Sequence, residues 1–310
     1  VQRSASWIAM SSPRRVGASL AGARSRQPVS LRSVIVQLAP RMRRAYFETR
    51  FGQLHVHGAM PVGGGFDEAT TLLCFHQSPM SGRVFRPFLG LMGRDRSAYA
   101  PDTPGFGESD PPSTKPSIAD YAGAMLDFLD QMRFRKVDLL GYHTGSLIAT
   151  EVALARPDLV RRIVMVAVPV LTDEERAAFR QSPWPLPAAE DGSHLMKEWQ
   201  FSQKWRGPGV TLEQLARGFA EKLRNGPQAW WGASAVMDYP ARERLAQLKS
   251  PVLVLRPKDD LWEATARAGK LLREARMVDL PQYGHGLFEV APRAGKLLRE
   301  ARMVDLPQYG

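Results

Sequence analysis

The chain has 310 residues, of which 44% are hydrophobic, and this suffices for one large globular domain or two ordinary ones. Its net charge of +11 is concentrated at the ends, because residues 1–41 contribute +7 and residues 293–310 contribute +2, which leaves +2 for residues 42–292. A nearly neutral body argues against a nucleic-acid partner. The sequence contains no run of about 18 apolar residues, so we predict no membrane span.

The N-terminal segment, residues 1–41, contains seven arginines and many serines and alanines but no lysine, aspartate or glutamate. This composition is typical of an organelle transit peptide, whereas Arg14 and Arg15, followed by V-G-A-S-L-A-G-A, are weakly similar to a twin-arginine export signal. A third alternative is upstream sequence, since Met42 opens the first regular strand pattern. We predict a disordered basic extension over 1–41 and a cytoplasmic protein, unless the segment is a genuine targeting signal.

From Met42 onward, candidate strands alternate with helical segments, which predicts an α/β fold with a mostly parallel sheet. Apolar and β-branched residues mark eight candidate strands: 45–51, 54–58, 71–75, 97–100, 137–140, 163–168, 252–255 and 277–280. The clearest helical pattern is 118–132, where apolar residues recur at spacings of three and four. We therefore predict an eight-stranded sheet flanked by helices.

Roughly 80 residues separate the strand at 163–168 from the next one, which is too long for a simple connection. This interval has helical patterns at 195–205 and 212–223. Five tryptophans also fall in it: Trp184, Trp199, Trp205, Trp230 and Trp231. We predict a helical lid over 171–248 that divides the core into 42–170 and 249–292. The tryptophans either line an apolar pocket beneath the lid or only pack it against the body.

The last 18 residues are an exact copy of an earlier segment, because the sequence of 267–284 returns letter for letter at 293–310. Solenoid repeats diverge and keep their period over several units, whereas this copy occurs once, at the chain end. We interpret 293–310 as a duplicated tail outside the core.

The stretch L-L-G-Y-H-T-G-S-L places His143 between a strand and a helix, with Gly141 and Gly145 on either side. Two flanking glycines permit a tight turn that lifts the middle side chain above the sheet edge, as in a nucleophile elbow. An acid should follow a later strand, where Asp259 and Asp260 stand, and Asp260 is preferred by position. His285 follows the last strand, so elbow, acid and histidine all lie at carboxyl ends of strands.

An anion-binding loop is predicted at H-Q-S-P-M-S-G, which follows the strand at 71–75. The backbone N–H of Ser78 in this loop could act together with that of Thr144, just after the elbow. Two such donors form the oxyanion hole that stabilises the tetrahedral intermediate of acyl transfer.

Together these motifs resemble the α/β-hydrolase fold superfamily over about residues 42–292. H-Q-S-P-M-S-G is similar to the superfamily's H-G-x-P loop, with Gln77 in place of glycine, and A-P-D-T-P-G-F-G-E-S-D is similar to its A-x-D-x-P-G-x-G-x-S-D segment. P-V-L-V-L-R-P-K-D-D and G-H-G-L-F-E-V-A-P resemble its acid and histidine segments. The departure is His143, where the superfamily has Ser, Asp or Cys, and neither Thr144 nor Ser146 is placed to substitute for it.

Three interpretations of His143 remain open. It could be the nucleophile that forms an acyl-imidazole, it could hold an attacking water together with His285, or it could be silent in a protein that only binds a ligand. We predict a hydrolase that acts on a small carboxylic ester, lactone or thioester with an apolar portion. The alternatives are a binding protein and a lyase or other cofactor-free enzyme with His285 as its base.

No cofactor or metal is expected for this chemistry. His55 and His57 alternate along a strand, which could imitate a metal-binding pair, but no third ligand stands near them in the sequence. The oligomeric state does not follow from the sequence.

Overall fold

A computed structural model describes residues 39–63, 70–182 and 186–288. Residues 1–38 of the predicted basic extension and the whole duplicated tail at 293–310 lie outside these ranges. Within them, every helix is too short or too polar to cross a membrane.

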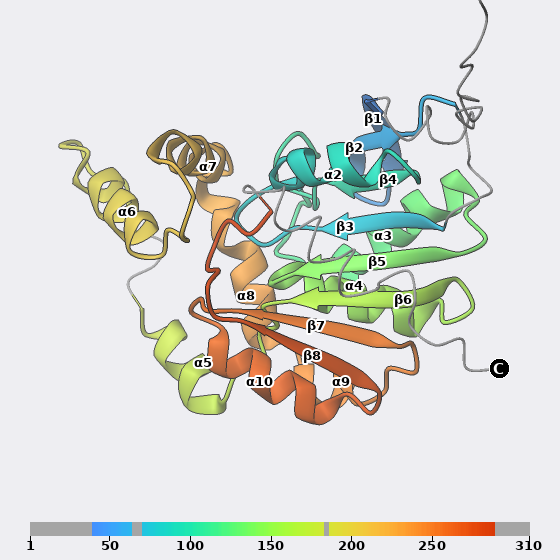
Figure 1. Ribbon diagram of the computed structural model, residues 1–310. Coiled ribbons are helices and arrows are strands. Elements are labelled where there is room, and N and C mark those ends of the chain that lie inside the picture. The colour runs from blue at the N-terminus through green and yellow to red at the C-terminus, as the bar shows by residue number, and fades with distance from the viewer. Residues whose placement is uncertain (1–38, 64–69, 183–185, 289–310) are drawn as a thin grey trace, which may run out of the picture.

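Eight strands form one sheet in the order β1-β2-β4-β3-β5-β6-β7-β8 (Figure 1). Strand β2 runs antiparallel to both of its neighbours, and all other neighbouring strands are parallel. The strands are β1 (Arg41–Thr49), β2 (Gly52–Met60), β3 (Thr71–Phe75), β4 (Ala98–Pro101), β5 (Val137–Tyr142), β6 (Val160–Val166), β7 (Val252–Pro257) and β8 (Ala275–Leu280). The predicted eight-stranded, mostly parallel sheet is confirmed.

Strand β1 begins earlier than the predicted range 45–51. Arg41 to Arg44 pair through their backbones with β2, although their side chains are exposed. An edge strand needs no apolar pattern for such pairing, so the apolar run marked only 45–51 although the strand pattern opens at Met42.

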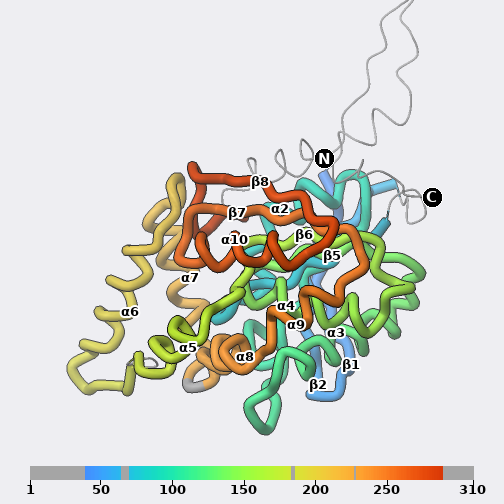
Figure 2. The backbone as a smooth tube through the Cα atoms, turned by 90° about the horizontal axis from the view of Figure 1, so that it is seen from below, coloured from blue at the N-terminus to red at the C-terminus, as the bar shows by residue number. Residues whose placement is uncertain are grey.

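Successive residues of the central strands contribute to two separate hydrophobic clusters, one on each face of the sheet. Leu73 and Phe75 belong to the cluster beneath α3 (Ile118–Met132) and α4 (Thr144–Ala155). Leu72 and Cys74 belong to the opposite cluster, against η1 (Gly82–Phe85) and α2 (Arg86–Met92). Figure 2 shows α3 and α4 together on one side of the strands, with α9 (Ala241–Leu245) next to them.

Helix α3 has the bounds predicted from its periodicity. Ser117 caps its N-terminus by accepting a hydrogen bond from the backbone N–H of Asp120, whose carboxylate in turn accepts one from the backbone N–H of Ser117. Such a reciprocal capping box satisfies two of the N–H groups that the first turn leaves unpaired, which fixes the start of the helix.

The interval between β6 and β7 is helical. It contains α5 (Asp173–Arg180), α6 (Ser193–Lys204), α7 (Leu212–Arg224), η2 (Gly226–Trp230), α8 (Trp231–Asp238) and α9. The helical patterns predicted at 195–205 and 212–223 correspond to α6 and α7. In Figure 1, α6, α7 and α8 stand at the end of the sheet toward which the arrowheads of β3, β5 and β6 point. That these helices act as a lid stays a prediction.

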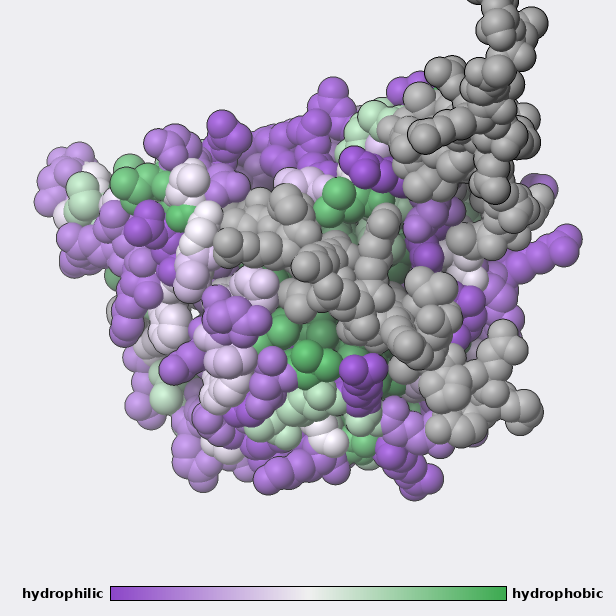
Figure 3. All heavy atoms as spheres, viewed as in Figure 1, coloured by the Kyte–Doolittle hydropathy of each residue, from purple (hydrophilic) through white to green (hydrophobic). Residues whose placement is uncertain are grey.

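Parts of this interval expose apolar side chains. The exposed ones on α6 and α7 are Leu195, Met196, Phe201, Leu212 and Leu223. Figure 3 shows hydrophobic residues among hydrophilic ones over these two helices. The remaining helix, α10 (Trp262–Leu271), packs against β7 and β8.

Candidate active site

The turn at His143 joins β5 to α4 and holds a strained backbone, with φ 51° and ψ −118°. A Cβ atom on Gly141 would lie 2.4 Å from the carbonyl oxygen of Gly145, and one on Gly145 would lie 2.0 Å from the carbonyl oxygen of Phe75. Neither position therefore accepts a larger residue without a shift of backbone. The sequence thus produces a sharp turn that presents the His143 side chain at the carboxyl end of the sheet.

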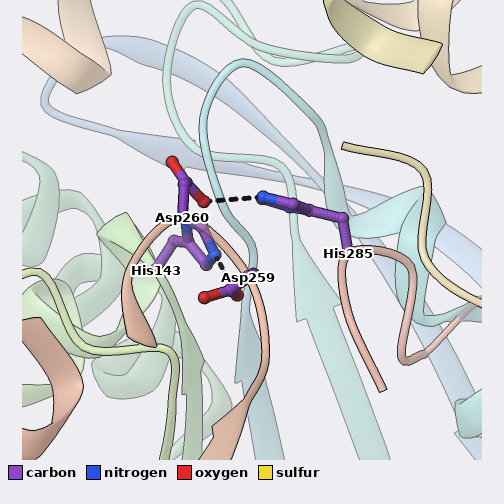
Figure 4. Close-up of side chains that lie close together, drawn as sticks. All are labelled: His143, Asp259, Asp260 and His285. Carbon is purple, nitrogen blue, oxygen red and sulfur yellow. Dashed lines mark hydrogen bonds and ion pairs between the residues drawn. The ribbon is translucent and has the colours of Figure 1, made fainter. Parts of the chain in front are cut away.

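Two histidine–aspartate pairs meet at this turn (Figure 4). His285 Nε2 lies 2.7 Å from Asp260 Oδ1, as the sequence predicted for the acid and the histidine. His143 Nε2 lies 3.1 Å from Asp259 Oδ2, a pairing that sequence reasoning missed. The two imidazole rings are 5.0 Å apart between centroids. Four side chains from three separate segments are thereby brought into one cluster.

The two carboxylates differ in their surroundings. The Asp259 side chain is fully buried, and its Oδ1 accepts a hydrogen bond of 3.0 Å from the backbone N–H of Leu261. The part of Asp260 that is shielded from water would raise its pKa, but the hydrogen bond from His285 and the nearby imidazoles hold this pKa at about 2. Asp260 is consequently ionised at neutral pH. Within the described ranges, no lysine or arginine forms an ion pair with either carboxylate.

The hydrogen bonds determine which ring nitrogen carries a proton. A carboxylate only accepts, so the Nε2 atoms of His143 and His285 must donate to Asp259 and Asp260. In the neutral rings this leaves Nδ1 unprotonated. Each neutral imidazole therefore has one nitrogen that donates to an acid and one that can only accept a hydrogen bond.

The loop after β3 is held by His76. The buried His76 ring accepts a hydrogen bond at Nε2 from the backbone N–H of Thr103, at 2.8 Å, and donates from Nδ1 to the carbonyl oxygen of Gln77, at 2.9 Å. Burial lowers the pKa of His76, in agreement with this neutral form. Ser78 and Thr144 both line the adjacent cavity, and in the described part of the chain neither backbone N–H donates to another backbone group. Their role as an oxyanion hole stays a prediction.

A cavity of about 630 Å³ lies above the two pairs, between the sheet and the inserted helices. Its lining is largely apolar and includes Met80, Leu171, Phe179, Phe219 and Val236. The predicted aromatic contribution is only partial. Trp205 and Trp230 line the cavity, whereas Trp199 packs against Phe219 and Trp184 lies outside the described residues. A volume of this size matches small-molecule sites.

The sequence profile of the α/β hydrolase fold family matches residues 70–292. The chain belongs to this family. A hydrolase from Pseudomonas aeruginosa has the same fold, with a TM-score of 0.66 and 23% identity over 84% of this chain and 98% of that one. The (E)-2-((N-methylformamido)methylene)succinate hydrolase of Acinetobacter baylyi is 26% identical over 198 residues, 62% of this chain and 73% of that protein. An uncharacterized protein of Mycobacterium tuberculosis is 33% identical over 90 residues, which is 29% of this chain and 26% of that protein.

In this α/β hydrolase, helix α7 is tied to the loop that carries Ser78. The buried Glu221 accepts a hydrogen bond from Ser81, and the side-chain amide of Asn225 donates to the carbonyl oxygen of Pro79, at 2.6 Å. Arg224 forms an ion pair of 2.9 Å with Glu108. The first two contacts hold the inserted segment against the predicted oxyanion loop, and the third holds it against the segment after β4. No sequence motif predicted these contacts.

A second histidine cluster lies in the core, away from the elbow. The buried His55 hydrogen-bonds Asp102 (Nδ1 to Oδ2, 2.8 Å), and His57 Nε2 lies 3.6 Å from Asp102 Oδ1. The sequence showed the two histidines but not their carboxylate, which follows β4. Asp102 also accepts hydrogen bonds from the backbone N–H groups of Gly82 and Glu108. Because its oxygens join three chain segments, we interpret this cluster as structural.

Proposed function

We propose that this α/β hydrolase cleaves a carboxylic ester, lactone or thioester by direct attack of water on the carbonyl carbon. The observation that carries the proposal is the pair of facing imidazoles, each held by its own aspartate, at the floor of an apolar cavity. The match to the hydrolase from Acinetobacter baylyi supports a hydrolytic reaction. The apolar lining favours a substrate with an apolar acyl or alcohol portion.

We place the attacking water between the two rings. Two hydrogen bonds of about 2.8 Å that meet at one oxygen span up to about 5 Å. One nitrogen of His143 and one of His285 lie within 4.8 Å of each other. We therefore assign His143 to hold the water and His285, oriented by Asp260, to take its proton.

The reaction then proceeds in two steps. The water oxygen forms a bond to the carbonyl carbon while its proton passes to His285, and the resulting oxyanion accepts hydrogen bonds from the backbone N–H groups of Ser78 and Thr144. The tetrahedral intermediate next expels the alcohol or thiol, which receives the proton from His285. The products are the carboxylic acid and the alcohol or thiol, and the enzyme regains its starting protonation.

The alternative in which His143 is the nucleophile is disfavoured by its hydrogen bond. Its Nε2 donates to the buried Asp259, so only Nδ1, the nitrogen nearer the backbone, would be left to attack. The two routes differ in one observable. An acyl-imidazole would add the mass of the acyl group to the protein in a rapid-quench experiment, whereas attack by water adds nothing.

The test is hydrolysis of a panel of unactivated esters, lactones and thioesters by the wild type, His285→Ala, Asp260→Asn and His143→Ala. Activated esters are unsuitable because free imidazole cleaves them. Loss of general-base catalysis should lower kcat/KM by about 10²- to 10⁴-fold in His285→Ala. The partly exposed His194 on α6 supplies a matched control, since His194→Ala should retain full activity. Equal activity in the wild type and His285→Ala would refute the proposal.

A further inference from the structure

The cluster at the elbow combines two carboxylates with two imidazoles, and within the described residues no lysine or arginine pairs with these carboxylates. Asp259 is fully buried, and in the described part of the chain the carboxylates of Asp259 and Asp260 pair only with His143 and His285. The cluster places two carboxyl groups and two imidazoles beside a largely apolar cavity. Buried charge is costly unless it is paired with opposite charge or coordinates a metal.

We infer that His143, Asp259, Asp260 and His285 form a binding site for one divalent transition-metal ion. One donor atom from each of the four side chains lies within 4.8 Å of the others. Figure 4 shows the four side chains converging from the turn after β5, the segment after β7 and the segment after β8. The charge of the ion would balance the two carboxylates.

The distances are close to those that an ion requires. Four ligand atoms bound at about 2.0–2.2 Å to a tetrahedral ion lie about 3.3–3.6 Å from one another. The two histidine–aspartate distances of 3.1 and 2.7 Å are within about 1 Å of this spacing. The widest separations need to close by no more than about 1.5 Å. Rotation of the partly exposed Asp260 and His285 side chains can supply this change.

The donor set indicates the kind of ion. Imidazole and carboxylate together suit zinc or cobalt, whereas magnesium and calcium prefer oxygen ligands alone. Binding displaces the Nε2 protons of any ring that coordinates through that nitrogen, so ion uptake releases protons. The site also opens into the 630 Å³ cavity, which leaves room for a water molecule on the ion.

The role of the ion, unlike its binding, rests on the proposed function. A water molecule bound to zinc has its pKa lowered to about 7, so it becomes hydroxide near neutral pH. In the loaded protein the ion would replace His285 as the group that activates the attacking water. Hydrolysis should therefore be faster in the loaded protein than in the metal-free one.

The first experiment measures binding directly. Untagged, chelator-treated protein is titrated with ZnCl₂ by isothermal calorimetry, and the cobalt-loaded protein is examined for d–d absorption bands. We expect one ion per chain and at least tenfold weaker binding in each of His143→Ala, His285→Ala and Asp259→Asn, because even residues that only orient a ligand change affinity 10- to 100-fold. The control His194→Ala should bind like the wild type. Circular dichroism checks that each variant is folded.

Several results would overturn the inference: no binding, binding unchanged in His143→Ala and His285→Ala, or binding lost in His57→Gln instead, which would place the ion in the core cluster. Hydrolysis assays of metal-free and zinc-loaded protein separate the two proposals. Zinc binding with the expected ligand dependence but no cleavage of any substrate refutes the proposed function alone. Full hydrolysis by metal-free protein that binds no zinc refutes the metal site alone. Ligand-dependent binding without a gain in rate rejects the role of the ion in water activation.

Discussion

Replacing Gly145 by alanine should force β3 and α4 apart at the elbow. The added Cβ would lie 2.0 Å from the carbonyl oxygen of Phe75 and 2.9 Å from that of His76. Carbon–oxygen contacts settle at about 3.3 Å or more, so the two backbones must separate by about 1 Å. Overpacking costs about 1–3 kcal/mol, and we expect the upper end because neither partner is a flexible side chain. At about 2–4 °C per kcal/mol, the melting temperature should fall by about 6–12 °C.

The assay is thermal and urea unfolding of Gly145→Ala beside Gly90→Ala. Gly90 lies inside α2, and an added Cβ there meets nothing within 4 Å. Alanine should therefore stabilise that helix by up to about 1 kcal/mol. The same substitution is thus expected to act in opposite directions at the two sites. Gly145→Ala that unfolds within about 2 °C of the wild type, less than 1 kcal/mol, would refute the reasoning about the close contact of the turn.

Three further predictions concern buried and partly buried polar groups. Burial lowers the pKa of His57 to about 4, so between pH 6.5 and 4 the unfolded chain binds more protons than the folded one, and the wild type should lose about 3 kcal/mol of stability. Urea unfolding of His57→Gln at pH 7 and 4.5 should show a smaller loss of stability than the wild type. An equal loss in the two proteins would contradict this. Glu151→Gln weakens the pair with Arg244, at 2.7 Å, and should lower the free energy of unfolding by about 2 kcal/mol, whereas an unchanged urea midpoint would contradict it. Glu221→Gln weakens the contact of Glu221 with Ser81, which holds α7 against the loop after β3, and should therefore speed limited proteolysis within α6 and α7. Cleavage at the wild-type rate would argue that this contact does not hold α7 in place.

Most of the fold could be predicted because its strands and helices have strong patterns. The central strands β3 and β5 are buried on both faces and appear as short apolar runs, and α3 has both periodicity and a capping residue. The prediction was least accurate at β1, where exposed arginines pair through the backbone alone. Pairing of this kind depends on the neighbouring strand, so the predicted apolar run begins at Ala45 although the strand pattern opens at Met42.

The candidate site was predictable where it depends on the ends of strands. His143, Asp260 and His285 each follow a strand, and parallel strands bring those ends together. The pairing of Asp259 with His143 was not predictable, because two consecutive aspartates point in different directions only once the turn after β7 is formed. The hydrogen bond from the backbone N–H of Leu261 to Asp259 belongs to that turn. Asp102 was missed for a similar reason, since it meets His55 from a different strand.

The positive φ angle at position 143 has an evolutionary consequence. Such a conformation costs about 1–3 kcal/mol for residues other than glycine, and the cost belongs to the backbone rather than to the side chain. Serine, cysteine, aspartate and histidine therefore meet the same backbone cost at this position. They differ in what they leave in the core, because a change from histidine also removes the partner of the fully buried Asp259, so an exchange of residues here has to be matched at position 259.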